Sequence, residues 1–438
     1  MGALNDKQIW DEVFDGDVHT ASGWTDALRK THKETGASGT SSLEPVALYL
    51  EPSLNSNNGH QLTLTGCYTQ LLTKLGYRTR VAHALKNSLQ QKEDWLPYFL
   101  VGHHTRVSRD INSLSELEKV ESYFLSEFEG LIEKHNPRVC IFATIRFTNI
   151  VAAAKALITN NTQHAVFGVM EAAEVPDCKD SSIVRSAFSR AARLLQESAV
   201  THMFIAETDH VRTFLLDCGF REENVKVFPY VAAKLITDIP ELSKKDSKNL
   251  QVGYLGGSRP VRHPELIADL LISDSLPDSV DLSVQLDLNY IHNKRGQNIC
   301  DKINKMHKAG SITLYPPSLS DQQYRALFCS LDFIILPYGE RYQQIGSGIL
   351  LEAVYAGVIP LLPADSKMNE LYTSLGGQAP SIKSLSTKAI RDSVIDGLVR
   401  YPTLKETVVT IREKWQQHPS SAEQWQYELT EWLPFHNV

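Results

Sequence analysis

The sequence predicts an α/β fold made of two doubly wound, Rossmann-like domains. The chain has 438 residues, which is too long for one ordinary hydrophobic core. Short apolar runs alternate with segments of helical periodicity along most of it, a pattern typical of βαβ units and parallel sheets. A polar, lysine-rich stretch at 243–249 interrupts this alternation, so we expect the two domains to join near 235–250.

The alternation divides the chain into four parts. Residues 1–44 are a polar appendage that ends in a Gly/Ser/Thr-rich linker and includes a candidate short helix at 7–14. Residues 45–240 and 250–415 are the two Rossmann-like domains. Residues 416–438 hold a last helix, rich in aromatic residues, which we expect to cross back to the N-terminal domain.

Each domain is predicted from its own series of elements. In the first, strands are expected at 46–50, 78–84, 139–144, 165–170 and 203–206, and helices at 61–75, 115–135, 150–157, 182–197 and 209–218. In the second, strands are expected at 252–255, 282–286, 312–315, 333–337 and 358–362, and helices at 264–271, 298–307, 321–329 and 348–356. The last helix, which follows this domain, is expected at 422–433. Ligands of doubly wound sheets bind at the carboxyl ends of the strands, so we expect a ligand there, in a cleft between the domains.

Composition excludes several classes of protein. The hydrophobic fraction of 42% and the charged fraction of 22% are those of a globular chain. A formal charge of -7 gives no general electrostatic reason to bind nucleic acid. Six widely spaced cysteines form no disulfide framework or zinc motif, so a reducing, cytoplasmic location is expected. No run is long enough to span a bilayer, which leaves only peripheral membrane contact open.

The stretch 331–363 carries the most chemical information. An apolar strand ends at Tyr338, and a polar loop then leads to Ser347, Gly348 and Ile349 at the start of a helix that carries Glu352. Free amides and the helix dipole favour an anion at such a helix start. From its position about a turn and a half along the helix, the carboxylate is placed to accept hydrogen bonds from a ribose diol. An equally good local interpretation is a Ser N-cap, glycines for a tight turn and a surface glutamate.

This stretch resembles the C-terminal signature of a large family of retaining glycosyltransferases, the group 1 or family-four type, which have the GT-B architecture. The matching residues are the Leu-Pro-Tyr that ends at Tyr338, Tyr342, Ser347-Gly348, the Glu-Ala that begins at Glu352, and Gly357. The resemblance implies that the loop amides bind the donor diphosphate and that Glu352 binds the ribose. It is strong over 310–363 and faint over the rest of 45–435.

The resemblance has one departure. The family has a second glutamate eight positions before the first, and this chain has Gln344 there. An amide can bind a sugar hydroxyl but carries no charge. Contact with the donor sugar at Gln344, and ordinary catalytic power, are therefore in question.

A glycine turn between 252 and 262 agrees with a diphosphate site. The strand is followed by Gly257 and by two cations, Arg259 and Arg262, before a helix begins. Guanidinium groups are suited to neutralising a departing diphosphate. The turn resembles the family's Gly-x-x-Arg motif, with Arg262 where a lysine is usual. A basic surface turn is the plain alternative for both arginines.

The N-terminal domain offers weaker candidates. Gly59 lies in a loop that resembles the family's glycine-rich first loop, although a generic β–α turn fits nearly as well. Strand ends place Arg146, Glu171 and Glu207 where the cleft is expected, and Glu171 stands where many family members have a histidine. His104, in a pair with His103, is a further catalytic candidate, although a solvated loop histidine is the commoner case.

The resemblance implies transfer of a sugar from a nucleoside diphosphate sugar to a hydroxyl acceptor, either a carbohydrate or a lipid-linked one, as in polysaccharide or glycoconjugate biosynthesis. The resemblance also implies that no metal is needed, and the sequence agrees, because no Asp-x-Asp stands at a strand end. No cofactor is expected. One alternative is another enzyme of the same scaffold, such as a sugar-nucleotide epimerase or a phosphorylase, although no pyridoxal phosphate motif is present. Another is a degenerate protein that binds a nucleotide sugar or scaffolds a partner transferase. A dinucleotide-dependent oxidoreductase is disfavoured, because no GxGxxG follows a strand.

Overall fold

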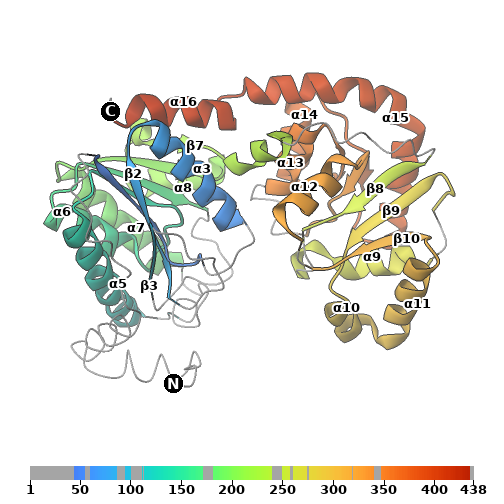
Figure 1. Ribbon diagram of the computed structural model, residues 1–438, viewed down its shortest axis with the longest axis horizontal. Coiled ribbons are helices and arrows are strands. Elements are labelled where there is room, and N and C mark those ends of the chain that lie inside the picture. The colour runs from blue at the N-terminus through green and yellow to red at the C-terminus, as the bar shows by residue number, and fades with distance from the viewer. Residues whose placement is uncertain are drawn as a thin grey trace. The chain divides into compact units, whose positions relative to one another are not determined.

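The computed structural model confirms the predicted α/β class (Figure 1). It describes residues 44–54, 60–85, 94–99, 111, 113–170, 181–238, 249–256, 260–273, 276–317, 319–339 and 347–434. The chain divides into two compact units. Unit 1 comprises Met1–Phe228 and Gln426–Val438, and unit 2 comprises Pro229–Trp425. The division at residue 228 lies ahead of the lysine-rich segment 243–249.

Unit 1 is built on a seven-stranded sheet with the order β3-β2-β1-β4-β5-β6-β7, in which all neighbours are parallel. Because the order reverses direction between β1 and β4, the loops after these two strands diverge to opposite faces of the sheet. The strands are β1 (Val46–Glu51), β2 (Arg78–Ala84), β3 (Trp95–Phe99), β4 (Val139–Phe142), β5 (His164–Val169), β6 (Thr201–Ala206) and β7 (Val225–Val227). The helices are α3 (His60–Lys74), α5 (Leu114–His135), α6 (Ile150–Thr159), α7 (Ser181–Gln196), α8 (Asp209–Asp217) and the 3-10 turn η1 (Glu222–Asn224).

Aromatic packing holds one face of this sheet against its helices. Phe142, Phe167 and Phe204 stack in sequence across β4, β5 and β6, with ring centroids 5.2 and 4.8 Å apart. Residues of α5, α6 and α7 close over them in one buried cluster. On β1, Leu48 and Leu50 join this cluster, whereas the ring of Tyr49 packs against α3 on the opposite face. The alternation along β1 therefore buries both faces of the sheet.

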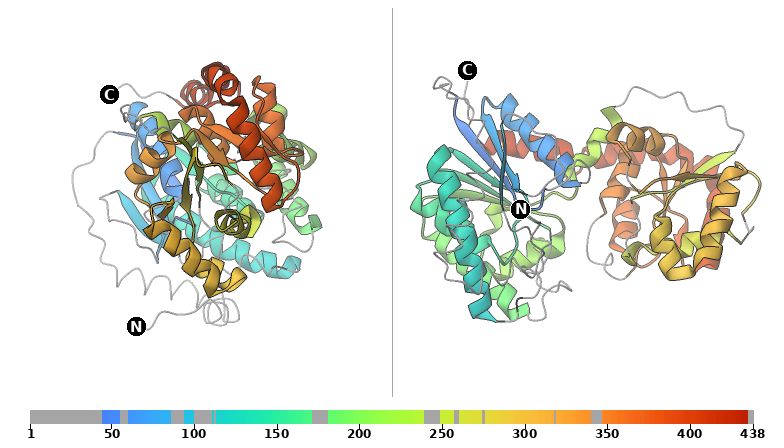
Figure 2. Two further views of the ribbon diagram at one scale, coloured as in Figure 1. Left: turned by 90° about the vertical axis from the view of Figure 1, so that its right-hand side faces the viewer. Right: turned by 60° about the horizontal axis from the view of Figure 1, so that its bottom comes forward.

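Unit 2 has a six-stranded parallel sheet with the order β10-β9-β8-β11-β12-β13, so its order reverses between β8 and β11. The strands are β8 (Leu250–Tyr254), β9 (Val280–Gln285), β10 (Ile312–Tyr315), β11 (Phe333–Ile335), β12 (Ile359–Pro363) and β13 (Ser381–Ile382). The helices are η2 (Val231–Asp238), η3 (Pro260–Arg262), α9 (Pro264–Leu271), α10 (Leu288–Arg295), α11 (Gln297–Lys308), α12 (Asp321–Cys329), α13 (Gly348–Ala356), α14 (Lys367–Ser374), α15 (Thr387–Gln416) and α16 (Ala422–Trp432), the last continuing into unit 1 at Gln426. Figure 2 shows helices on both faces of each sheet.

Sequence periodicity predicted most of these elements closely. The expected bounds of β2, β10, α9, α12 and α13 match the structure. Side chains cap two of the helices. Thr208 accepts a hydrogen bond from the Val211 amide at 3.3 Å, and Ser320 and Gln323 form a reciprocal capping box. The short strands β3, β7 and β13 and the helices α10, α14 and α15 were not predicted. The helix α15 contains Pro402, which ordinarily signals a helix end.

Within the ranges described above, no helix combines the length and apolar character that crossing a bilayer requires. The same residues contain no group of three or more His, Cys, Asp or Glu side chains that could hold a metal ion.

Candidate functional site

The switch point of the unit 2 sheet brings several predicted residues together. The loop after β8 leads into η3 and Arg262, and the loop after β11 holds Tyr338. The amide of Gly339 donates to the carbonyl of Val261 at 3.0 Å, which joins the two loops directly. Ligands of doubly wound sheets bind in the crevice at such a switch point. Strand order therefore places these two loops where a ligand is expected.

Arg262 is held by both loops. Its guanidinium carbon lies 5.3 Å from the centroid of the Tyr338 ring, and its Nη1 donates to the carbonyl oxygen of Gly256. Gly256 has φ +99°, and a Cβ at this position would overlap the side chain of Ile349. Only glycine therefore allows the chain after β8 to pass this close to the start of α13. The result is a partly exposed cation beside a helix N-terminus.

The start of α13 has the geometry of an anion-binding site. The hydroxyl of Ser347 accepts a hydrogen bond from the Leu350 amide at 3.3 Å, so the serine is a true N-cap. The amides of Gly348 and Ile349 belong to the first turn, where no intrahelical acceptor exists. A Cβ on Gly348 would lie 2.8 Å from the ring of Tyr230, so glycine is required here by close packing. The dipole of α13 adds partial positive charge at this end.

Glu352 is buried, with only 7% of it exposed. This excludes the alternative interpretation in which it is a surface glutamate. Its Oε2 accepts a hydrogen bond from the Tyr324 hydroxyl of α12 at 2.7 Å. Burial raises the pKa of the Glu352 carboxyl to about 7, against the lowering effects of the Tyr324 hydrogen bond and of Arg262 and Arg325. A buried carboxyl with a perturbed pKa at a switch point is a functional-site signature. Sequence reasoning identified Glu352 but missed Tyr324.

Six predicted site residues lie outside the described residues, so the structure does not test their assignment. They are Gly59, His104, Glu171, Gly257, Arg259 and Gln344.

Unit 1 has a second buried carboxyl at its own switch point. Glu51 ends β1, is fully buried, and accepts a hydrogen bond from the Ser53 amide at 3.0 Å. Burial raises the pKa of Glu51 to about 7, and the hydroxyl of Thr144 and the charge of Arg146, both just after β4, lower it in part. Sequence reasoning placed Arg146 at a strand end and overlooked Glu51. An acidic residue that closes an apolar strand was the available signal.

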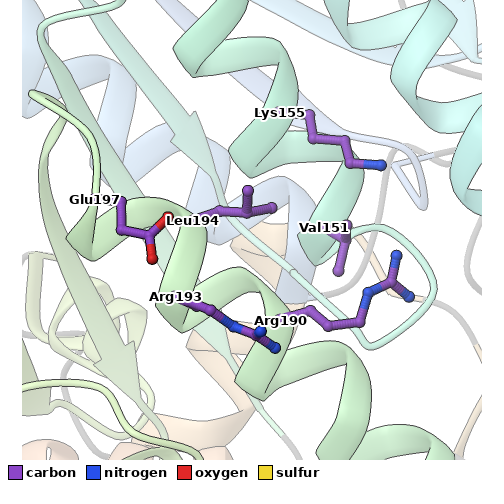
Figure 3. Close-up of a pocket in the computed structure, with 6 residues that line it drawn as sticks. All are labelled: Val151, Lys155, Arg190, Arg193, Leu194 and Glu197. Atoms are coloured by element: carbon purple, nitrogen blue, oxygen red, sulfur yellow. The ribbon is translucent and has the colours of Figure 1, made fainter.

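A pocket of about 280 Å³ lies elsewhere in unit 1, against α6 and α7 (Figure 3). Arg190 forms a two-pronged ion pair with the buried carboxylate of Glu121, at 3.1 and 3.0 Å. None of the predicted site residues lines this pocket, whose lining has more basic than acidic side chains. Its lining residues are Val151, Lys155, Arg190, Arg193, Leu194 and Glu197.

No protein-family model matches the chain, and no curated protein matches it in sequence. Solved structures match its fold. HepE from Anabaena, determined in complex with UDP and glucose, gives a TM-score of 0.58 at 12% identity, covering 88% of this chain and 98% of that one. WaaG, a glycosyltransferase involved in lipopolysaccharide biosynthesis, gives a TM-score of 0.55 at 14% identity, covering 88% and 99%. UDP-GlcNAc 2-epimerase from Neisseria meningitidis, bound to UDP-GlcNAc, gives a TM-score of 0.53 at 13% identity, covering 87% and 98%. The chain thus has the GT-B fold, with two Rossmann-like domains.

Proposed function

We propose that this chain is a glycosyltransferase that moves a sugar from a nucleoside diphosphate sugar to an acceptor hydroxyl. The observation that carries the proposal is the arrangement at the unit 2 switch point. There an N-capped helix start, the guanidinium of Arg262 and the buried carboxyl of Glu352 lie on adjoining elements. The helix start and Arg262 are suited to binding a diphosphate, and the carboxyl of Glu352 is suited to binding a ribose. The solved structures of similar fold that carry UDP or a UDP-sugar support this interpretation.

Each residue has a definite role in the proposal. The amides of Gly348 and Ile349 bind the diphosphate, and Arg262 neutralises the charge that develops when the bond to the anomeric carbon breaks. Glu352 accepts hydrogen bonds from the ribose diol. Tyr338 holds the Arg262 guanidinium through its ring face, which keeps the cation directed at the phosphate site.

The finer parts of the proposal rest on the sequence resemblance. The enzymes that 331–363 resembles retain the configuration of the anomeric carbon and need no metal, because cations and helix amides stabilise the leaving diphosphate. We extend both properties to this chain, together with a carbohydrate or lipid-linked acceptor and no organic cofactor. The cysteine pattern supports a cytoplasmic location.

A second candidate is a protein that binds a nucleotide sugar without transferring it. Gln344 favours this candidate, because the family has a second glutamate there and an amide cannot carry its charge. An epimerase is a third candidate, because a UDP-GlcNAc 2-epimerase shares the fold.

One screen separates these candidates. The purified chain is mixed with UDP-, ADP- and GDP-sugars, with and without a panel of sugar acceptors, and its thermal shift, nucleotide release and sugar products are measured. Acceptor-dependent release of the diphosphate with a retained anomeric configuration is the expected result. A thermal shift without any product would indicate the binding-only protein, and a changed sugar still attached to its nucleotide would indicate an epimerase. If no nucleotide shifts the melting temperature, the proposed site is wrong.

A further inference from the structure

The hydrogen bond between Tyr324 and Glu352 joins two helices of unit 2. Tyr324 lies in the first half of α12, Glu352 lies in the middle of α13, and the hydroxyl-to-Oε2 distance is 2.7 Å. A carboxylate can accept about four hydrogen bonds over its two oxygens. Among the residues that the structure describes, only Tyr324 donates one to this carboxyl. None of those residues donates to its second oxygen, Oε1.

The nearby cations only weakly offset the cost of burying a negative charge at Glu352. Arg262 and Arg325 act on Glu352 through charge alone, and both rank behind the Tyr324 hydrogen bond in lowering its pKa. The other ionisable groups that face the Tyr324 hydroxyl are the phenols of Tyr230 and Tyr338. Tyr324 is thus the principal group that stabilises the ionised form of Glu352.

We propose that Tyr324 is a positioning residue for nucleotide binding, which fixes one oxygen of Glu352 and leaves the other directed at the ribose diol. The inference rests on the proposed function, because it takes the ribose as the ligand of Glu352. A phenol has one donor on a rigid ring, so it orients the carboxylate plane as well as stabilising its charge. An ionised carboxylate is also a stronger acceptor for a diol than its protonated form.

The proposal makes the effect of Tyr324 dependent on pH. Its hydrogen bond lowers the pKa of Glu352, so Tyr324→Phe raises that pKa further. Less of Glu352 is then ionised at pH 7, and nucleotide affinity falls. As the pH rises toward 9, Glu352 ionises in both proteins and the difference shrinks. A purely structural role for Tyr324 would instead weaken binding equally at every pH.

Unit 2 contains a closely matched control. The hydroxyl of Tyr401 donates to Oδ1 of Asp332 at 2.7 Å, and Asp332 is 8% exposed. Asp332 directly precedes β11, at the amino end of the strand, whereas the candidate site is at the carboxyl end. Tyr401→Phe therefore removes the same bond to a similarly buried carboxyl away from the site.

The test is isothermal titration calorimetry with UDP, ADP and GDP between pH 6 and 9. Tyr324→Phe should bind nucleotide roughly threefold to tenfold more weakly at pH 7, which is the effect of one hydrogen bond. This loss should shrink toward pH 9. Tyr401→Phe should follow the native protein throughout, which also corrects for titration of the nucleotide itself. Adding Tyr324→Phe to Glu352→Gln should weaken binding less than Tyr324→Phe weakens it in the native protein, because glutamine has no charge for Tyr324 to stabilise.

Two outcomes would overturn the inference while leaving the proposed function intact. One is native-like binding by a folded Tyr324→Phe protein, and the other is a loss of equal size at every pH. If Tyr324→Phe does not fold, Glu352→Gln still provides a test. Removing the charge must flatten the pH dependence to that of the nucleotide, and a persistent native profile would contradict the inference. Absence of binding by the native chain to all three nucleotides would overturn the proposed function, and this inference with it.

Discussion

Replacing Glu352 by glutamine should stabilise unit 2 while weakening the binding of nucleotide. Burial raises the pKa of this carboxyl from 4.5 in the unfolded chain to about 7 in the folded one. A shift of one pKa unit corresponds to about 1.4 kcal/mol, so ionising Glu352 in the folded state costs about 3 kcal/mol at pH 8. Glutamine has nearly the same shape, can still accept the hydrogen bond from Tyr324, and avoids that cost.

The sign of the pH dependence follows from proton linkage. Between pH 4.5 and about 7 the folded state binds the proton of Glu352 more tightly than the unfolded state does. The contribution of this group to stability is therefore complete below pH 4.5 and decreases as the pH rises to about 7. Glu352→Gln should change stability little at pH 4.5 and increase it by up to about 3 kcal/mol at pH 8.

Urea denaturation at these two pH values measures the difference. Glu370→Gln provides a control in the same unit, because the Glu370 side chain is 64% exposed and an exposed substitution should change little at either pH. Equal stability of Glu352→Gln and the native protein at pH 8, with an unchanged dependence on urea, would refute the argument from burial. Nucleotide affinity, measured on the same samples, should fall.

Three further perturbations test other parts of the structure. Arg262→Ala should slow transfer roughly 10²–10³-fold, as loss of one oxyanion donor does, and an unchanged kcat would remove Arg262 from the reaction. Gly348→Ala should destabilise unit 2 by about 1–3 kcal/mol and weaken nucleotide binding, because its Cβ would lie 2.8 Å from the Tyr230 ring. The control is Gly66→Ala, at a helical position with open space, which should be neutral or stabilising in the same thermal melt. Glu51→Gln should stabilise unit 1 as the pH rises through about 7, for the reason given for Glu352, and nucleotide titration should show an unchanged affinity.

Local patterns in the sequence determined the elements well, because the interactions that start and end them are themselves local. The capping box of Ser320 and Gln323 spans four residues, and the N-cap of α13 depends on Ser347 and the amide three positions on. Such contacts form within one turn of chain, so spacing alone predicts them. The helix α15 escaped prediction for the opposite reason. Gly397 and Pro402 both disfavour a helix locally, and tertiary packing overrides them.

Gly397 shows how that packing acts. A Cβ at this position would lie 3.0 Å from the Phe333 ring of β11 and 3.3 Å from Pro380. The glycine lets α15 approach the sheet closely, which explains why a poor helix former stands in the middle of a long helix. Nothing within the neighbouring sequence reveals the ring that it accommodates.

The candidate site divides in the same way. By itself, the sequence determined the segment from Ser347 to Glu352, its helix start and the basic turn at Arg262, because each lies within one short stretch of chain. Only the tertiary structure decided that β8 and β11 are neighbours, which joins that turn to Tyr338, and that Tyr324, 28 residues earlier, reaches Glu352. Strand order and burial arise from packing between residues distant in sequence, and burial in turn sets the pKa of a carboxyl. The chemistry of Glu352 therefore depends on neighbours that no local pattern could identify.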